Sequence, residues 1–181
     1  MDIGPPPDAE VVARVLGGDA EAFSLIVRRY EASLLRFAAR MLGGNGDAED
    51  AVAESFVRAY RHLASCREPA RLRTWLYRIV ANRCKSHLAR RPRADISLDD
   101  APPVADPADN EAALERAEQL GLVQRALLQL SPEKRAAFVL KHVEGLSYEE
   151  MAAITGERVP TLKMRVHRAR EALLKLLEDY A

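Results

Sequence analysis

The sequence predicts an all-α fold, with two helical bundles joined by a flexible acidic linker and a helix-turn-helix in the C-terminal bundle. Apolar residues recur at i, i+3 and i+4 through most of the chain, and no stretch shows the two-residue alternation typical of strands. Residues 92–110 lack this period and are rich in proline and aspartate. Charge follows the same division, because residues 1–91 carry 15 basic and 11 acidic groups whereas residues 92–121 carry 2 and 8. We therefore expect bundles at 1–91 and 111–181 and a linker at 92–110.

Four helices are expected in the N-terminal bundle. They are predicted near 9–16, over 20–42 from an N-cap at Asp19, over 47–63 from an N-cap at Asp47, and over 74–91 from an N-cap at Thr74. The run Gly43-Gly44-Asn45-Gly46 separates the second from the third, because residues that favour positive φ end helices. Residues 64–73, which contain Pro69, are expected to form a loop.

The outward face of the third helix carries a mixed patch. Asp50, Ala53, Glu54 and Val57 recur at i, i+3, i+4 and i+7, with Arg58 beside them. Acids near a helix N-terminus often only complement the helix dipole. Exposed Ala and Val between acids and arginines are more typical of a protein-docking face.

The following loop and fourth helix combine basic and aromatic residues. Between Arg67 and Arg91 there are eight basic residues and one acid. Such a surface suits a nucleic-acid strand that is held by its phosphates and stacks its bases on aromatic rings. The candidate contacts are Arg67, Arg71, Arg73, Trp75, Tyr77, Arg78, Asn82 and Lys85. A purely structural role in the core remains an alternative for Trp75.

The C-terminal bundle ends in a helix-turn-helix. Helices are expected over 111–129 and over 133–144, the latter opened by Ser131-Pro132. Ser147 and Glu150 then form a capping-box pattern, Gly156 suits a left-handed C-terminal residue, and Pro160 suits the first turn of a basic helix reaching Leu177. The face opposite its apolar stripe predicts DNA binding in the major groove, against the alternative of a solvated charged surface. Its candidate residues are Arg158, Thr161, Lys163, Met164, Arg165, His167 and Arg168.

The chain offers no pattern for catalysis. There is no Ser/His/Asp arrangement, no phosphate-binding glycine loop and no metal-ligand spacing, so we expect a non-enzyme without cofactor or metal. Cys66 and Cys84 are interpreted as reduced structural thiols of a cytoplasmic protein. No apolar run reaches the length of a membrane span, and the first residues lack a signal-peptide pattern. We therefore expect neither membrane insertion nor export.

Three segments together resemble a known family. Residues Asp47–Phe56, Thr74–Asn82, and Gly145–Ile154 followed by Thr161–Arg170 are similar to motifs of bacterial RNA polymerase sigma factors of the sigma-70 family. The short two-domain form resembles the extracytoplasmic-function (ECF) group. The resemblance covers nearly everything outside the linker.

The resemblance implies a role for each surface. The first bundle would be region 2, with Asp50, Ala53, Glu54, Val57 and Arg58 docking on the β′ clamp of core RNA polymerase and the basic-aromatic residues reading and melting the −10 element. The second bundle would be region 4, which reads the −35 element and contacts the β flap. The linker would thread through the polymerase, which would fix the spacing of two otherwise mobile bundles. A cognate anti-sigma factor that covers both DNA-binding surfaces is also expected.

Some residues depart from the family pattern. Ala53 stands where glutamine is frequent, Ser86 and Ala89 where aspartate and arginine are frequent, Pro160 where glycine is common and Met164 where serine is common. Pro160 and Met164 are therefore expected to alter the −35 preference. Two other readings of the chain stay open: an autonomous helix-turn-helix regulator with an N-terminal sensor or dimerisation bundle, and a purely interacting helical protein.

Overall fold

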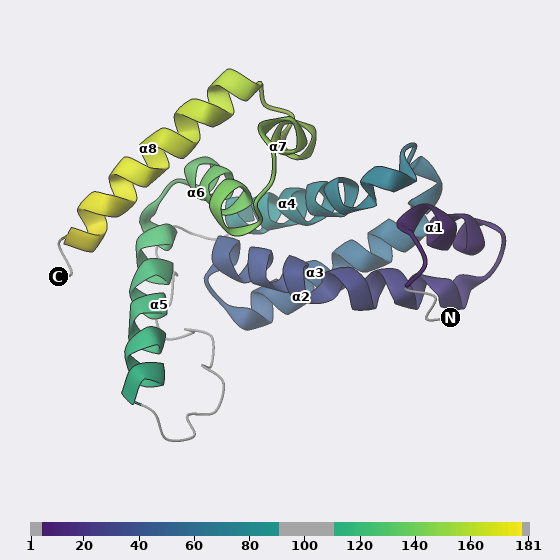
Figure 1. The fold of residues 1–181 in the computed structure, drawn as a ribbon, viewed down its shortest axis with the longest axis horizontal. Coiled ribbons are helices and arrows are strands. Elements are labelled where there is room, and N and C mark those ends of the chain that lie inside the picture. The colour runs from purple at the N-terminus through teal and green to yellow at the C-terminus, as the bar shows by residue number, and fades with distance from the viewer. Residues whose placement is uncertain (1–4, 91–110, 179–181) are drawn as a thin grey trace.

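The protein is helical throughout the part that the structure describes. The computed structural model describes residues 5–90 and 111–178, with residues 111–118 by their backbone alone, so the linker expected at 92–110 lies outside the described residues. The α-helices, shown in Figure 1, are α1 Asp8–Leu16, α2 Phe23–Leu42, α3 Asn45–Arg61, α4 Leu72–Arg90, α5 Glu111–Gln129, α6 Pro132–Phe138, α7 Tyr148–Thr155 and α8 Val159–Glu178. Short 3-10 turns lie at Ala20–Ala22, Leu63–Ser65 and Pro69–Arg71, and a π-helical turn, Val139–Val143, extends α6.

Two helix starts in the N-terminal bundle differ from the prediction. Helix α3 begins at Asn45 after the extended Gly44, so Asp47 lies in the first turn rather than at the N-cap. There its carboxylate still complements the helix dipole, and it lies 3.4 Å from His87 Nε2. Helix α4 begins at Leu72, directly after the 3-10 turn at Pro69–Arg71, so Thr74 lies buried in the first turn of the helix and not at its N-cap.

The predicted capping residues of the C-terminal bundle are confirmed. The Ser147 hydroxyl accepts from the Glu150 amide at 3.1 Å, and the Ser147 amide donates to the Glu150 carboxylate at 2.8 Å. Gly156 ends α7 with φ 75°, a left-handed conformation that costs glycine little. Pro160 lies in the first turn of α8, where its missing amide hydrogen removes no helical bond.

Both bundles contribute to one continuous apolar core. Helix α7 packs on α4, and α5 and α6 pack on the C-terminal end of α2, as Figure 1 shows. Residues from both sequence halves, such as Phe37 and Tyr77 on one side and Leu140 and Met151 on the other, are fully buried in it. The structure thus shows the two bundles packed against each other, and the mobility of the free chain stays a prediction.

Several large apolar side chains on the helices are exposed. Leu120 is 65% exposed, and Leu16 and Tyr60 are about half exposed. Leu16 is the last residue of α1, and Tyr60 lies in the last turn of α3. Periodicity identifies an apolar face, whereas burial also requires a neighbour at that height along the helix.

Candidate nucleic-acid interface

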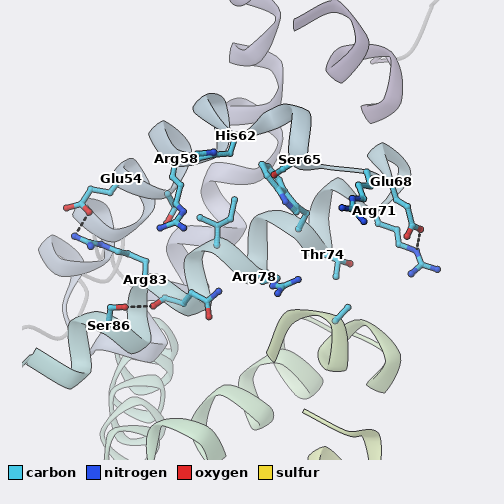
Figure 2. Close-up of a pocket in the computed structure, with 16 residues that line it drawn as sticks. Glu54, Arg58, His62, Ser65, Glu68, Arg71, Thr74, Arg78, Arg83 and Ser86 are labelled. Atoms are coloured by element: carbon cyan, nitrogen blue, oxygen red, sulfur yellow. Dashed lines mark hydrogen bonds and ion pairs between the residues drawn. The ribbon is translucent and has the colours of Figure 1, made fainter. Parts of the chain in front are cut away.

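A groove of about 870 Å³ runs between α3 and α4 and is rich in arginine. Helix α3 contributes Glu54 and Arg58, the connecting turns contribute Arg67, Glu68 and Arg71, and α4 contributes the remaining polar wall. Figure 2 shows Arg58 and Arg78 lying on opposite walls. The residues that line the groove from α4 are Thr74, Trp75, Arg78, Ile79, Asn82, Arg83 and Ser86.

The electrostatics of the groove favour an anion. Its two acids each pair with an arginine, Glu54 with Arg83 and Glu68 with Arg71, the latter at 3.1 Å. Within the described residues, Arg58 and Arg78 have no acidic partner and are exposed. A guanidinium donates to phosphate oxygens in a fork, and Trp75, half-buried beside them, offers a ring face. The groove can therefore hold the backbone of a single strand and stack a base.

The structure brings five of the eight predicted strand contacts together. Those in the groove are Arg67, Arg71, Trp75, Arg78 and Asn82. Tyr77 is fully buried instead, with its ring edge-on to that of Phe37. Its hydroxyl donates to the Glu144 carboxylate, and burial raises the pKa of Tyr77. Arg73 lies on the same side of α4 as Tyr77, and Lys85 is exposed outside the groove. In this arrangement Tyr77 does not reach the surface, so a contact between Tyr77 and DNA would require the bundles to separate.

Helical spacing explains which residues meet. Positions 71, 75, 78 and 82 follow the i, i+4, i+7 pattern of one helix face, whereas positions 73 and 77 lie on another. The same pattern extends to Ser86 and includes Arg83 on its flank, two lining residues that were not predicted. The prediction relied on the number of basic residues and not on their helical phase, so it missed two residues that line the groove.

The predicted docking face of α3 is exposed and adjoins this groove. Asp50, Ala53, Glu54, Val57 and Arg58 are all exposed, and Val57 shows 51% of its surface. Tyr60, one turn further on, is 46% exposed and packs edge-on against Phe23. The Glu54–Arg83 ion pair ties this face to α4. An exposed valine and tyrosine among charged residues form the kind of surface that a protein partner covers.

The basic helix α8 presents its outer face freely. Leu162, Val166, Ala169 and Leu173 are buried, as the apolar stripe predicts. Met164 is half exposed and lies with Thr161, Arg165 and Arg168 beside the start of α6.

Arg158, Lys163 and His167 are exposed nearby. Arg165 pairs with Glu157 at 3.1 Å, and Lys163 lies over the Tyr148 ring at 5.6 Å. Ser131 and Lys134, from the start of α6, line the same recess and were not predicted. Four of the seven predicted residues thus line one recess, and the other three are exposed outside it.

Among the described residues, no three metal-ligating side chains lie close enough to hold a metal ion, and none of the helices is long and apolar enough to cross a membrane. Both cysteines are buried in this part of the chain, and burial raises the pKa of the Cys84 thiol to about 12.

Two family models match the chain, one on each bundle. The model of sigma-70 region 2 matches residues 26–94 and contains the arginine-rich groove. The model of sigma-70 region 4 matches residues 120–173 and contains the helix-turn-helix.

Relatives match along nearly the whole length. The chain is 36% identical to the RNA polymerase sigma-H factor of Pseudomonas aeruginosa, with 94% of each chain aligned. It is 38% identical to the ECF RNA polymerase sigma-E factor of Salmonella typhimurium and 37% identical to that of Escherichia coli, with 92% of each chain aligned in both cases.

Solved structures share the fold. CnrH, in complex with the cytosolic domain of CnrY, aligns with 96% of this chain and 99% of its own at a TM-score of 0.73 and 26% identity. RpoE of Bartonella quintana, in complex with the anti-sigma factor NepR, aligns with 86% of this chain and 96% of its own at a TM-score of 0.68 and 30% identity.

Proposed function

Since this chain belongs to the ECF group of the sigma-70 family, which directs promoter-specific transcription initiation by RNA polymerase, we propose that its three surfaces divide that task. The exposed face of α3 docks on the β′ clamp of core polymerase. The groove between α3 and α4 takes the non-template strand of the −10 element. Helix α8 enters the major groove of the −35 element.

The observation that carries this division is the arginine-rich groove beside an exposed apolar patch. Arg58 and Arg78 stand without acidic partners in the part of the chain that the structure describes, next to the ring of Trp75. Duplex DNA would not enter a groove between two adjacent helices, whereas a single strand can lie along it. A melted strand arises only after polymerase is bound, which accounts for a docking face at the rim of the same groove.

Partners and location follow from the same assignment. Relatives have been solved with an anti-sigma factor and with a cytosolic domain bound, and we propose that a protein of the anti-sigma class binds this chain too. The chain would act in the cytoplasm, contact the β flap through region 4, and carry no catalytic site, cofactor or metal of its own. An autonomous regulator is disfavoured, because the N-terminal bundle matches region 2 rather than a sensor domain.

Three variants test the division of roles. Val57→Asp places a charge in the docking face and should weaken binding to core polymerase at least tenfold. Arg168→Ala should leave core binding unchanged and lower transcription from promoters that carry a −35 element. Lys175→Ala, in the exposed last turn of α8, is the matched control and should change neither quantity. Equal loss of core binding in Val57→Asp and Arg168→Ala would refute the division.

A further inference from the structure

The first residue of α1 is tied to α2 by its side chain. The Asp8 carboxylate accepts from Arg29 through Oδ1 and from the Tyr30 hydroxyl through Oδ2. Arg29 also donates to the Pro6 carbonyl at 2.6 Å, just before the helix begins. The Asp8 side chain is 17% exposed and Tyr30 is buried, so water and salt screen these contacts little. An acid in the first turn of a helix often only complements the helix dipole, whereas this one is also fixed by two donors from another helix.

Helix α1 in turn packs on the chain that connects α3 to α4. It contacts the 3-10 turns Leu63–Ser65 and Pro69–Arg71, and Figure 1 shows it beside the start of α4. Cys66, between the two turns, is buried. Burial and, to a smaller extent, the negative charge of Asp8 raise the pKa of the Cys66 thiol. The carboxylate that ties α1 to α2 therefore lies close to the segment that joins the turns.

The same turns supply one end of the arginine-rich groove. Ser65, Arg67, Glu68 and Arg71 line the groove from this segment, and Figure 2 shows three of them, Ser65, Glu68 and Arg71, at the same end of it. On the groove side, Arg71 pairs with Glu68 at 3.1 Å, but both side chains are largely exposed, and exposed pairs contribute little stability. The position of the turns therefore depends on their inner side, where Leu63 is buried and α1 packs.

We propose that Asp8 is a positioning residue for the −10 strand. Its bonds to α2 fix α1 beneath the turns, and the turns hold Arg67 and Arg71 at the end of the groove. Asp8 does not line the groove itself, so it acts through these two arginines. A strand binds more weakly when only a fraction of the molecules hold the contacting groups in place. The inference rests on the proposed function, because it concerns the same groove.

Binding of a single-stranded −10 oligonucleotide to the polymerase-bound chain tests this role. Asp8→Ala should weaken that binding about fivefold, because the turns then hold their arginines in place for only part of the time. Tyr30→Phe removes one of the two donors and should weaken binding in the same direction but by less. Affinity for core polymerase should stay unchanged in both variants. Arg14→Ala is the matched control and should change neither affinity, since it removes only an exposed ion pair with Asp19 at the other end of α1.

A double-mutant cycle separates positioning of the turns from a general loss of stability. In a chain that carries Arg67→Ala and Arg71→Ala, Asp8→Ala should have no further effect on oligonucleotide affinity, because the groups that Asp8 positions are gone. In an Arg78→Ala background the loss caused by Asp8→Ala should persist in full, since Arg78 lines the groove from α4 and not from the turns. Equal losses in all three backgrounds would show that Asp8 acts on the whole fold, and would overturn the proposal.

The results that would overturn this role differ from those that would refute the function of the groove. Wild-type oligonucleotide affinity in an Asp8→Ala chain with wild-type helicity by circular dichroism would show that Asp8 positions nothing in the groove. If Asp8→Ala lowers the helicity, Tyr30→Phe carries the same cycle, because it alters a single hydroxyl. Failure of the wild-type chain to bring the oligonucleotide to core polymerase would instead refute the proposed function, whatever the variants do.

Discussion

Replacement of Arg135 by methionine should destabilise the protein by about 3 kcal/mol. The side chain is 3% exposed, and its guanidinium donates to the carbonyls of Leu127, Leu128 and Leu130 at the end of α5 and to that of Met41 in α2. Carbonyls in the last turn of a helix have no helical donor. Leu127 O keeps a bond from the Leu130 amide, so three carbonyls lose their partner at about 1 kcal/mol each.

The cost of burying the Arg135 charge offsets part of the stabilisation that these hydrogen bonds provide. It lowers the pKa of Arg135 to about 10, which leaves the guanidinium charged at neutral pH. Methionine removes that desolvation cost but supplies no hydrogen-bond donor. The loss of the bonds to the carbonyls should outweigh the saving, so the variant should be less stable than the wild type. Arg135→Lys keeps a charge without the planar fork and should fall between methionine and wild type.

Urea unfolding followed by circular dichroism and by Trp75 fluorescence measures this effect. In thermal unfolding, the same loss of about 3 kcal/mol corresponds to a fall in Tm of about 6–12 °C for a chain of this size. Arg125→Met, at an exposed position of α5, is the control and should change stability by less than about 0.5 kcal/mol. An Arg135→Met variant as stable as this control would refute the claim that Arg135 stabilises the protein by donating to these carbonyls.

Three further outcomes follow from the structure. Arg78→Ala should weaken binding of the polymerase-bound chain to a single-stranded −10 oligonucleotide and reduce the slope of log K against log salt by about 0.7, the value expected when one phosphate is no longer neutralised; an unchanged slope would place Arg78 outside the strand path. Ser147→Ala should cost about 1 kcal/mol in urea unfolding by removing the capping box, and a loss below about 0.3 kcal/mol would contradict the cap geometry. Cys66 and Cys84 should react slowly with a thiol reagent at pH 8 in the native protein and rapidly in urea, because burial raises the pKa of both thiols and restricts access. Rapid modification of two thiols in the native state would show that the core around them is open.

Local signals in the sequence were sufficient for the helix-turn-helix. Ser147 and Glu150 act on amides three residues away, Gly156 sets one backbone conformation, and Pro160 fits one turn. The apolar stripe of α8 likewise depends only on helical phase. These elements could be predicted because each physical cause lies within a few residues of its effect.

Contacts between distant segments could not be predicted in this way. The Arg135 guanidinium donates to the Met41 carbonyl, 94 residues away in the sequence, and nothing near Arg135 marks it as a buried cation. The Tyr77 hydroxyl donates to the Glu144 carboxylate, 67 residues away in the sequence. Tyr77 was predicted to contact DNA at the surface, whereas this contact is buried. The start of α4 at Leu72 was missed because the residues before Thr74 form a 3-10 turn that continues directly into the helix.

Above all, this chain should make RNA polymerase start at particular promoters. The most direct test combines the purified chain with core RNA polymerase on fragmented genomic DNA and maps the 5′ ends of the transcripts. We expect a set of start sites that appear only with this chain, share −10 and −35 elements upstream, and disappear with Val57→Asp. The same start sites in the presence and absence of the chain would contradict this role.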